Sequence, residues 1–115
     1  MVHKIFMVKW ELANNHKKDF NWDEELFSFS DSNFYQSESW AKHKSNFNWK
    51  VYRFVAFDQN DSIKSMAQCL IRFYPFNSCI ISCPGGPIGD LKSFDRSFID
   101  YLTQLLGKKY IYLRM

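Results

Sequence analysis

Two long extended runs, joined by four polar residues, constrain the fold of this chain more than any other part of its sequence. The runs extend from Lys50 to Asp58 and from Ile63 to Tyr74, on either side of Gln59-Asn60-Asp61-Ser62. In the second run apolar and polar residues alternate, which is typical of a strand with one face against a core. Two strands with a four-residue polar connection predict a β-hairpin. Part of the core must therefore be built on an antiparallel sheet.

The rest of the chain supplies further strands and three helical segments. The additional strands are predicted over Lys4–Leu12, Ser78–Cys83 and Tyr110–Met115. Helices are predicted over Asn21–Phe29, from a cap at Ser37 to about Lys44, and over Phe94–Leu106, where apolar residues recur at helical spacing. This order predicts an α/β or α+β fold, in which helices flank a mixed, mainly antiparallel sheet.

Composition excludes two broad classes of protein. Of the 115 residues, 19% are aromatic and 46% are hydrophobic, a content that disordered polar chains do not reach. No window approaches the roughly 18 consecutive apolar residues of a membrane-spanning helix, so no span is expected. The 15 basic and 12 acidic residues leave a net charge of +3. This excess is too small to indicate a nucleic-acid-binding protein, and no DNA partner is expected.

The three cysteines, Cys69, Cys79 and Cys83, indicate a reducing compartment. The N-terminus lacks the long apolar core and the cleavage site of a secretory signal, and an odd number of cysteines is then typical of reduced thiols. We therefore expect a cytoplasmic protein with ordinary buried cysteines. The alternative is a metal site that uses Cys79-x-x-x-Cys83, but no histidine or cysteine pair has the spacing to complete it. Neither a metal ion nor a cofactor is expected.

The stretch from Pro84 to Asp90 is rich in glycine and proline and is the first candidate for binding chemistry. Glycines let backbone amides approach a phosphate, but this stretch matches no known phosphate-loop pattern, and Pro87 removes one amide donor. We therefore interpret Gly86 and Pro87 as residues of a structural turn.

A second candidate is the small basic and aromatic cluster of Trp40, Lys42 and Lys44. These side chains can hold a phosphate, and a solvated helix face explains them equally well. The acidic run Asp23–Glu25 is interpreted as the exposed start of a helix rather than as an acid–base pair. No catalytic residue can be assigned, because nothing in the sequence places a histidine beside a nucleophile.

Three segments occur together in an informative order. Phe34-Tyr35-Gln36-Ser37-Glu38-Ser39-Trp40-Ala41-Lys42-His43-Lys44 is similar to the pattern f-x-Q-S-x-x-W-a-x-x-K. Pro84-Gly85-Gly86-Pro87-Ile88-Gly89-Asp90 is similar to a p-r-G-P-v-x-D turn, with Gly85 in place of the usual basic residue. Tyr110-Ile111-Tyr112-Leu113-Arg114 is similar to a strand that leads into an acidic residue and proline. In this order and spacing, the segments resemble the Fem-type family over roughly residues 34–115.

Fem-type proteins are non-ribosomal peptidyltransferases of peptidoglycan biosynthesis. They move an amino acid from an aminoacyl-tRNA to the stem peptide of a nucleotide- or lipid-linked peptidoglycan precursor. The resemblance implies that residues 1–115 form the N-terminal domain, or an incomplete part of it, of a protein with two N-acetyltransferase-like domains. Such a fragment is expected to be inactive alone.

The resemblance also implies roles for three residues in substrate binding. Lys42 would contact the diphosphate of the precursor, where an ammonium–phosphate pair is strong when partly desolvated. Trp40 would position the helix that carries Lys42, and Arg114 would lie on the strand leading to the cleft between the two domains. Gly86 and Pro87 would shape the turn.

Two other classes of function remain open alternatives. One is a non-catalytic interaction or scaffold fragment that dimerises through an exposed sheet edge. The other is a small-molecule N-acetyltransferase, although the acetyl-coenzyme A signature [QR]-x-x-G-x-[GA] is missing at the glycine-rich stretch.

Overall fold

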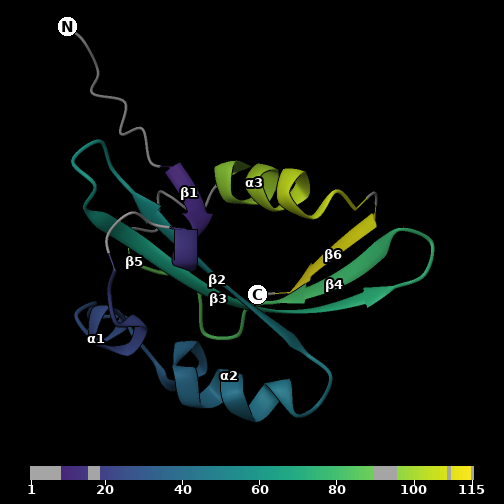
Figure 1. The fold of residues 1–115 in the computed structure, drawn as a ribbon, viewed down its shortest axis with the longest axis horizontal. Coiled ribbons are helices and arrows are strands. Elements are labelled where there is room, and N and C mark those ends of the chain that lie inside the picture. Colours follow the sequence, from purple (N-terminus) through teal and green to yellow (C-terminus); the bar gives the residue numbers. More distant parts are fainter. Residues whose placement is uncertain (1–8, 16–18, 90–95, 109, 115) are drawn as a thin grey trace, which may run out of the picture.

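The structure is a computed structural model that describes residues 9–15, 19–89, 96–108 and 110–114 (Figure 1). The strands are β1 Lys9–Leu12, β2 Lys50–Phe57, β3 Ile63–Tyr74, β4 Ser78–Ser82, β5 Ile88–Gly89 and β6 Tyr110–Arg114. The helices are α1 Trp22–Leu26, α2 Glu38–Ser45 and α3 Arg96–Leu106, with 3-10 turns η1 Ala13–Asn15 and η2 Phe34–Gln36. The predicted starts of the first strand, at Lys4, and of the last helix, at Phe94, lie outside the described residues.

The six strands form one open sheet. The strand order is β1-β2-β3-β4-β6, and the short β5 pairs with β3 beside β4. All neighbouring strands are antiparallel except β4 and β6, which run parallel and are connected through α3. A mixed, mainly antiparallel sheet flanked by helices is the fold class predicted from the sequence, and the structure confirms it.

Helices cover both faces of the sheet. Figure 1 shows α3 on one face and α1 and α2 on the opposite face. On the α3 face, Phe98 and Leu102 pack into a cluster that includes the fully buried Phe54 of β2. The cluster on the opposite face consists of Trp22, Leu26, Val55, Met66 and Ile88. Because apolar side chains alternate along β2 and β3, each strand contributes to both clusters.

The central strand β3 is buried on both faces between Ser65 and Ile71, where its sequence predicted one buried face. Cys69 packs in the α3 cluster, and Met66 packs in the α1 cluster. Between them lies Gln68, whose exposed fraction is 1%. A buried amide is tolerated only when it is hydrogen-bonded, so the partners of Gln68 explain why a polar residue can face a covered surface.

Local capping sets the helix ends. α1 ends at Leu26 rather than at the predicted Phe29, because the Ser28 hydroxyl donates to the Glu25 carbonyl over 2.6 Å and the Phe29 amide turns back to Leu26. α2 begins as predicted, with the Ser37 hydroxyl accepting from the Trp40 amide at 3.3 Å. No helix in the described ranges is long and apolar enough to cross a membrane.

All three cysteines are free and buried, as predicted. A hydrogen bond with Cys83, together with burial, raises the pKa of the Cys69 thiol well above its ordinary value. Burial also raises the pKa of Cys79. Thiolates are therefore disfavoured at these positions, and the cysteines act as small apolar core residues.

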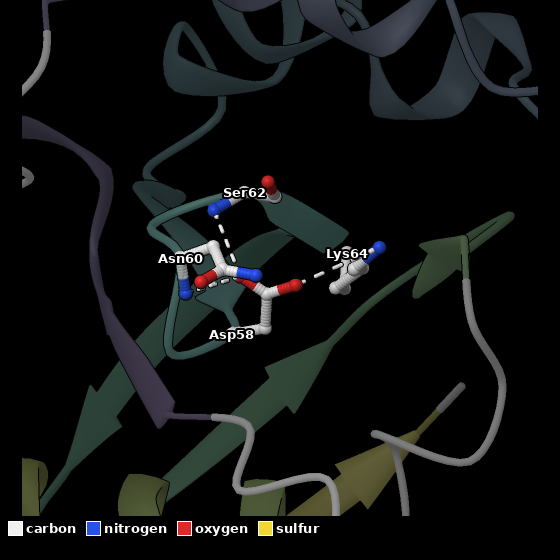
Figure 2. A network of polar contacts seen from close by, with 4 residues as sticks. All are labelled: Asp58, Asn60, Ser62 and Lys64. Atoms are coloured by element: carbon white, nitrogen blue, oxygen red, sulfur yellow. Dashed lines mark hydrogen bonds and ion pairs between the residues drawn. The ribbon is translucent and has the colours of Figure 1, made fainter.

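The loop between β2 and β3 is organised by one carboxylate, as Figure 2 shows. The Asp58 side chain accepts from the backbone amides of Asn60, at 2.9 Å, and of Ser62, at 3.0 Å. Its second oxygen lies 3.7 Å from the ammonium of Lys64. These contacts close the hairpin without a glycine, because an aspartate side chain can replace a backbone acceptor in a tight turn.

We predict that the Asp58 carboxylate stabilises this loop in a pH-dependent way. Hydrogen bonds from the Ser62 and Asn60 amides and the nearby Lys64 hold the pKa of Asp58 below its ordinary value. A depressed pKa means that the contribution is complete above the unfolded-state pKa and is lost as the pH falls through the folded-state value. An Asp58→Asn variant should therefore unfold at lower urea than the native chain at pH 7, and the difference should shrink in acid. An NMR titration in which Asp58 protonates at or above its ordinary pKa would contradict this.

Candidate functional site

Two loops that are distant in sequence are held together by three side chains. Residues 31–36 lead into α2, and residues 84–89 follow β4 and end with the short strand β5. Each contact joins a side chain of the first loop to the backbone of the second. The pairs are Asp31 with the Gly89 amide, Asn33 with the Gly85 carbonyl, and Gln36 with the Pro84 carbonyl. The structure thus brings together the first two segments on which the Fem-type resemblance rests.

The Gln36 side chain fills a gap in the sheet. β3 pairs with β5 at Ser65 and Met66 and with β4 from Leu70 onward, so no described strand pairs with residues 67–69 on this side. The Gln36 amide takes that place: its Oε1 accepts from the Gln68 amide at 2.7 Å, and its Nε2 donates to the Gln68 carbonyl at 3.1 Å. One buried side chain therefore supplies both backbone hydrogen bonds that a neighbouring strand residue would make.

The same network fixes the start of α2. The Gln68 side-chain amide donates to the Ser37 carbonyl over 2.8 Å, and the Trp22 indole donates to the Gln36 carbonyl over 2.7 Å. The Glu38 amide in turn donates to the Asp23 carboxylate over 3.0 Å. α2 is consequently anchored to both β3 and α1 by its first residues.

Arg53 of β2 extends this network to the surface. It lies opposite Gln68 in the hairpin, and its Nε donates to the Gln68 Oε1 over 2.8 Å. Its guanidinium also lies over the Trp22 ring, 5.5 Å from the centroid. Burial lowers the pKa of Arg53, while the negative charges of Glu38 and Asp23 raise it. The guanidinium remains a cation at neutral pH and is held in one orientation.

An open pocket of about 670 Å³ lies beside Arg53. β1 ends at Leu12, opposite Phe54, and β2 continues beyond it, so the pocket forms where the sheet loses its outer strand. Its apolar lining consists of Leu12, Ala13, Phe20, Trp22, Val51 and Tyr52. Its polar lining consists of Asn14, Asp19, Asn21, Glu38 and Arg53. Among the described residues, nothing accepts a hydrogen bond from the two Nη groups of Arg53, which leaves these donors available to the pocket.

Two of the three predicted substrate-binding residues lie on α2. Trp40 is half-buried and contacts Tyr35 at 5.0 Å between ring centroids, which ties η2 to α2. The Lys44 ammonium, rather than that of Lys42, lies over the Trp40 ring at 5.0 Å. Lys42 is exposed, one helical turn after Glu38 and on the same face of α2. Lys42 therefore lies next to Glu38, the residue of α2 that lines the pocket.

The third predicted binding residue and the turn residues lie at the end of β4. Arg114 of β6 pairs in register with Ser82, and its side chain is outside the described part of the structure. Gly86 and Pro87 follow a turn in which the Gly86 amide donates to the Cys83 carbonyl. A Cβ atom on Gly86 would lie 2.5 Å from Cδ of Gln36, so glycine allows the turn to pack flat on that amide. The backbone amides of Gly86 and Gly89 both donate to acceptors within the protein, the Cys83 carbonyl and the Asp31 carboxylate.

Arg53 and Gln68 were missed by sequence reasoning, although the hairpin itself contained a signal. A hairpin closed at residues 59–62 places Arg53 opposite Gln68, as observed, although an irregularity between Ala56 and Phe57 makes Phe57 the partner of Ile63. Two long polar residues facing each other in the middle of apolar strands indicate a buried polar pair. No sequence signal indicated the role of Gln36, because the unpaired stretch of β3 that it bonds results from the way β4 and β5 pair with β3 in the folded chain.

No model of a known protein family matches the sequence, and no curated protein matches it. Among the described residues no group of three His, Cys, Asp or Glu side chains is arranged to bind a metal ion.

We predict that Gly86→Ala destabilises the fold through Gln36. The added methyl group would overlap the Gln36 amide, and such overpacking costs about 1–3 kcal/mol. In a Gln36→Ala background the same substitution should cost less, because the overlapping atoms are gone. Urea unfolding of the two single variants and the double variant measures this coupling.

Gly107→Ala is the matched control for this cycle. A Cβ at Gly107 meets no atom within 4 Å, although its φ of +59° gives the substitution a backbone cost of about 1 kcal/mol. That cost should be the same with and without Gln36. Strict additivity of Gly86→Ala and Gln36→Ala would show that the two residues do not share a contact.

Proposed function

We propose that this chain is the N-terminal part of a Fem-type aminoacyltransferase. The complete enzyme would transfer an amino acid from an aminoacyl-tRNA to the stem peptide of a nucleotide- or lipid-linked peptidoglycan precursor in the cytoplasm. The proposal rests on the resemblance of three segments. One structural observation supports it: these segments meet where β4 ends, beside the middle of β3.

That meeting point involves all three segments. One side chain of the first segment, that of Gln36, donates a hydrogen bond to the Pro84 carbonyl of the glycine-rich turn. The third segment forms β6, whose Arg114 pairs with Ser82 two residues before Pro84. Segments that lie far apart in sequence but form one local structure are more informative than three separate weak patterns, because packing then constrains them jointly.

Within this proposal, the described residues divide into binding and supporting roles. Lys42 is exposed and free to approach a diphosphate, and Trp40 supports its helix through contacts with η2. Gly86 and Pro87 would hold the turn in shape, and Arg114 lies on β6, the strand that would lead toward the cleft between the two domains. No residue of the chain is assigned to the chemical step, which the proposal places in the complete two-domain enzyme.

We predict that replacing Lys42 weakens binding of a uridine-diphosphate-linked muropeptide. A charge-assisted contact to phosphate is worth about 1.5–3 kcal/mol, so Lys42→Ala should raise the dissociation constant about tenfold or more, and added salt should reduce the difference. Isothermal titration calorimetry with the 115-residue chain or a longer natural protein measures this. Lys9→Ala is the matched control, since it removes an equally exposed lysine from β1.

Two results would contradict the proposal. The first is absence of binding to the longest natural form of the protein, and the second is equal binding by Lys42→Ala and Lys9→Ala. Binding of acetyl-coenzyme A instead of the muropeptide would favour the N-acetyltransferase alternative.

A further inference from the structure

We infer that the pocket beside Arg53 binds a small zwitterionic ligand, an amino acid or a very short peptide, with the carboxylate on Arg53 and the ammonium near Glu38. This inference rests on the pocket alone and does not depend on the proposed function. Four features of the site support it.

The first feature is a preorganised carboxylate receptor. Arg53 uses its Nε for Gln68 and rests on the Trp22 ring, while its two Nη groups have no acceptor among the described residues. An arginine held in this way can offer its Nη donors to a carboxylate without losing much further side-chain freedom. Its partial burial strengthens such a pair, because less water competes for the donors.

The second feature is the sign of the surrounding charges. Glu38 and Asp19 line the pocket, and the negative charges of Glu38 and Asp23 both act on Arg53. Among the described lining residues, a phosphate dianion would meet the cation of Arg53 and be repelled by the carboxylates of Glu38 and Asp19. A zwitterion satisfies both signs, because its ammonium can face the carboxylates while its carboxylate faces the arginine.

The third feature is how the charges are exposed. Glu38 and Asp19 are exposed at the pocket, whereas Arg53 is partly buried. Glu38 is held in place at its backbone, since its amide donates to Asp23. An ammonium group would therefore lie toward the solvent, and the carboxylate would lie deeper.

The fourth feature is the apolar lining and the size of the site. Aliphatic and aromatic side chains, among them Val51, Tyr52 and Phe20, form part of the wall between the polar groups. A volume of about 670 Å³ is within the range of small-ligand sites. Apolar side chains of an amino acid or dipeptide can therefore be accommodated between the charged groups.

The test is an NMR titration of the isotope-labelled 115-residue chain with L-leucyl-L-leucine. Three further probes separate the charges: the N-acetylated dipeptide, the dipeptide amide and inorganic phosphate. We expect the free dipeptide to shift the resonances of Trp22 and Arg53. Blocking either end should weaken binding by about tenfold, as expected for the loss of one charged contact.

Variants assign the two ends of the ligand. Arg53→Gln should weaken binding of the free dipeptide about tenfold, with the Gln68 amide resonance reporting that the fold is retained. Glu38→Gln should weaken binding of the free dipeptide but leave the N-acetylated form unchanged. Glu24→Gln is the matched control, because Glu24 is exposed and is not part of the pocket lining.

The Glu38 comparison decides the question even if Arg53→Gln fails to fold, since Glu38 is exposed and its side chain makes no hydrogen bond to another residue in the described ranges. Three results would overturn the inference: no shift with the free dipeptide, equal binding of the free and N-acetylated forms, or preferential binding of inorganic phosphate in the same pocket. Failure of the Lys42 experiment would leave this result unaffected, because Lys42 is not part of the pocket lining.

Discussion

The described structure depends above all on the amide of Gln36. On one edge, β3 pairs with β4 from Leu70 onward and with β5 at Ser65 and Met66. Between these two stretches the chain leaves the sheet at the end of β4 and rejoins it as β5. The backbone N–H and C=O groups of Gln68 therefore have no strand partner on this edge. Burying them without hydrogen bonds would cost several kcal/mol. Gln36 supplies both hydrogen bonds and also binds Pro84 of the departing loop. The same side chain thus pairs with the unpaired part of β3 and holds the loop whose departure leaves it unpaired.

The hydrogen bonds of Gln36 and Gln68 also position two residues of the candidate pocket. Gln36 lies two residues before α2, next to the cap residue Ser37, so fixing its side chain also fixes the start of the helix and with it the backbone of Glu38. On the adjacent strand, the side chain of Gln68 orients Arg53. The side chain of Arg53 and the backbone of Glu38 are thus positioned on neighbouring elements by one connected network of hydrogen bonds. Their relative position is a consequence of the fold rather than of a flexible loop.

Periodicity and capping predicted much of the fold, because they are local. The hairpin and the Ser37 cap could be derived from the sequence, and the structure confirms them. The double burial of β3 could not be derived, since it depends on α1 packing against the face that carries Gln68. Gln36 lies in the first segment that resembles Fem-type proteins, yet its hydrogen-bond partners are 32 and 48 residues away in the sequence. Contacts at that separation are set by tertiary packing, which no local pattern records.

Amide hydrogen exchange at Gln68 tests the central role of Gln36 most directly. If the Gln36 Oε1 replaces a strand, the Gln68 amide should exchange as slowly as amides paired within the sheet, such as that of Phe54. In a Gln36→Leu variant it should exchange at least about tenfold faster, while the Phe54 amide stays protected. Fast exchange of Gln68 in the native chain, or unchanged exchange in the variant, would contradict the account.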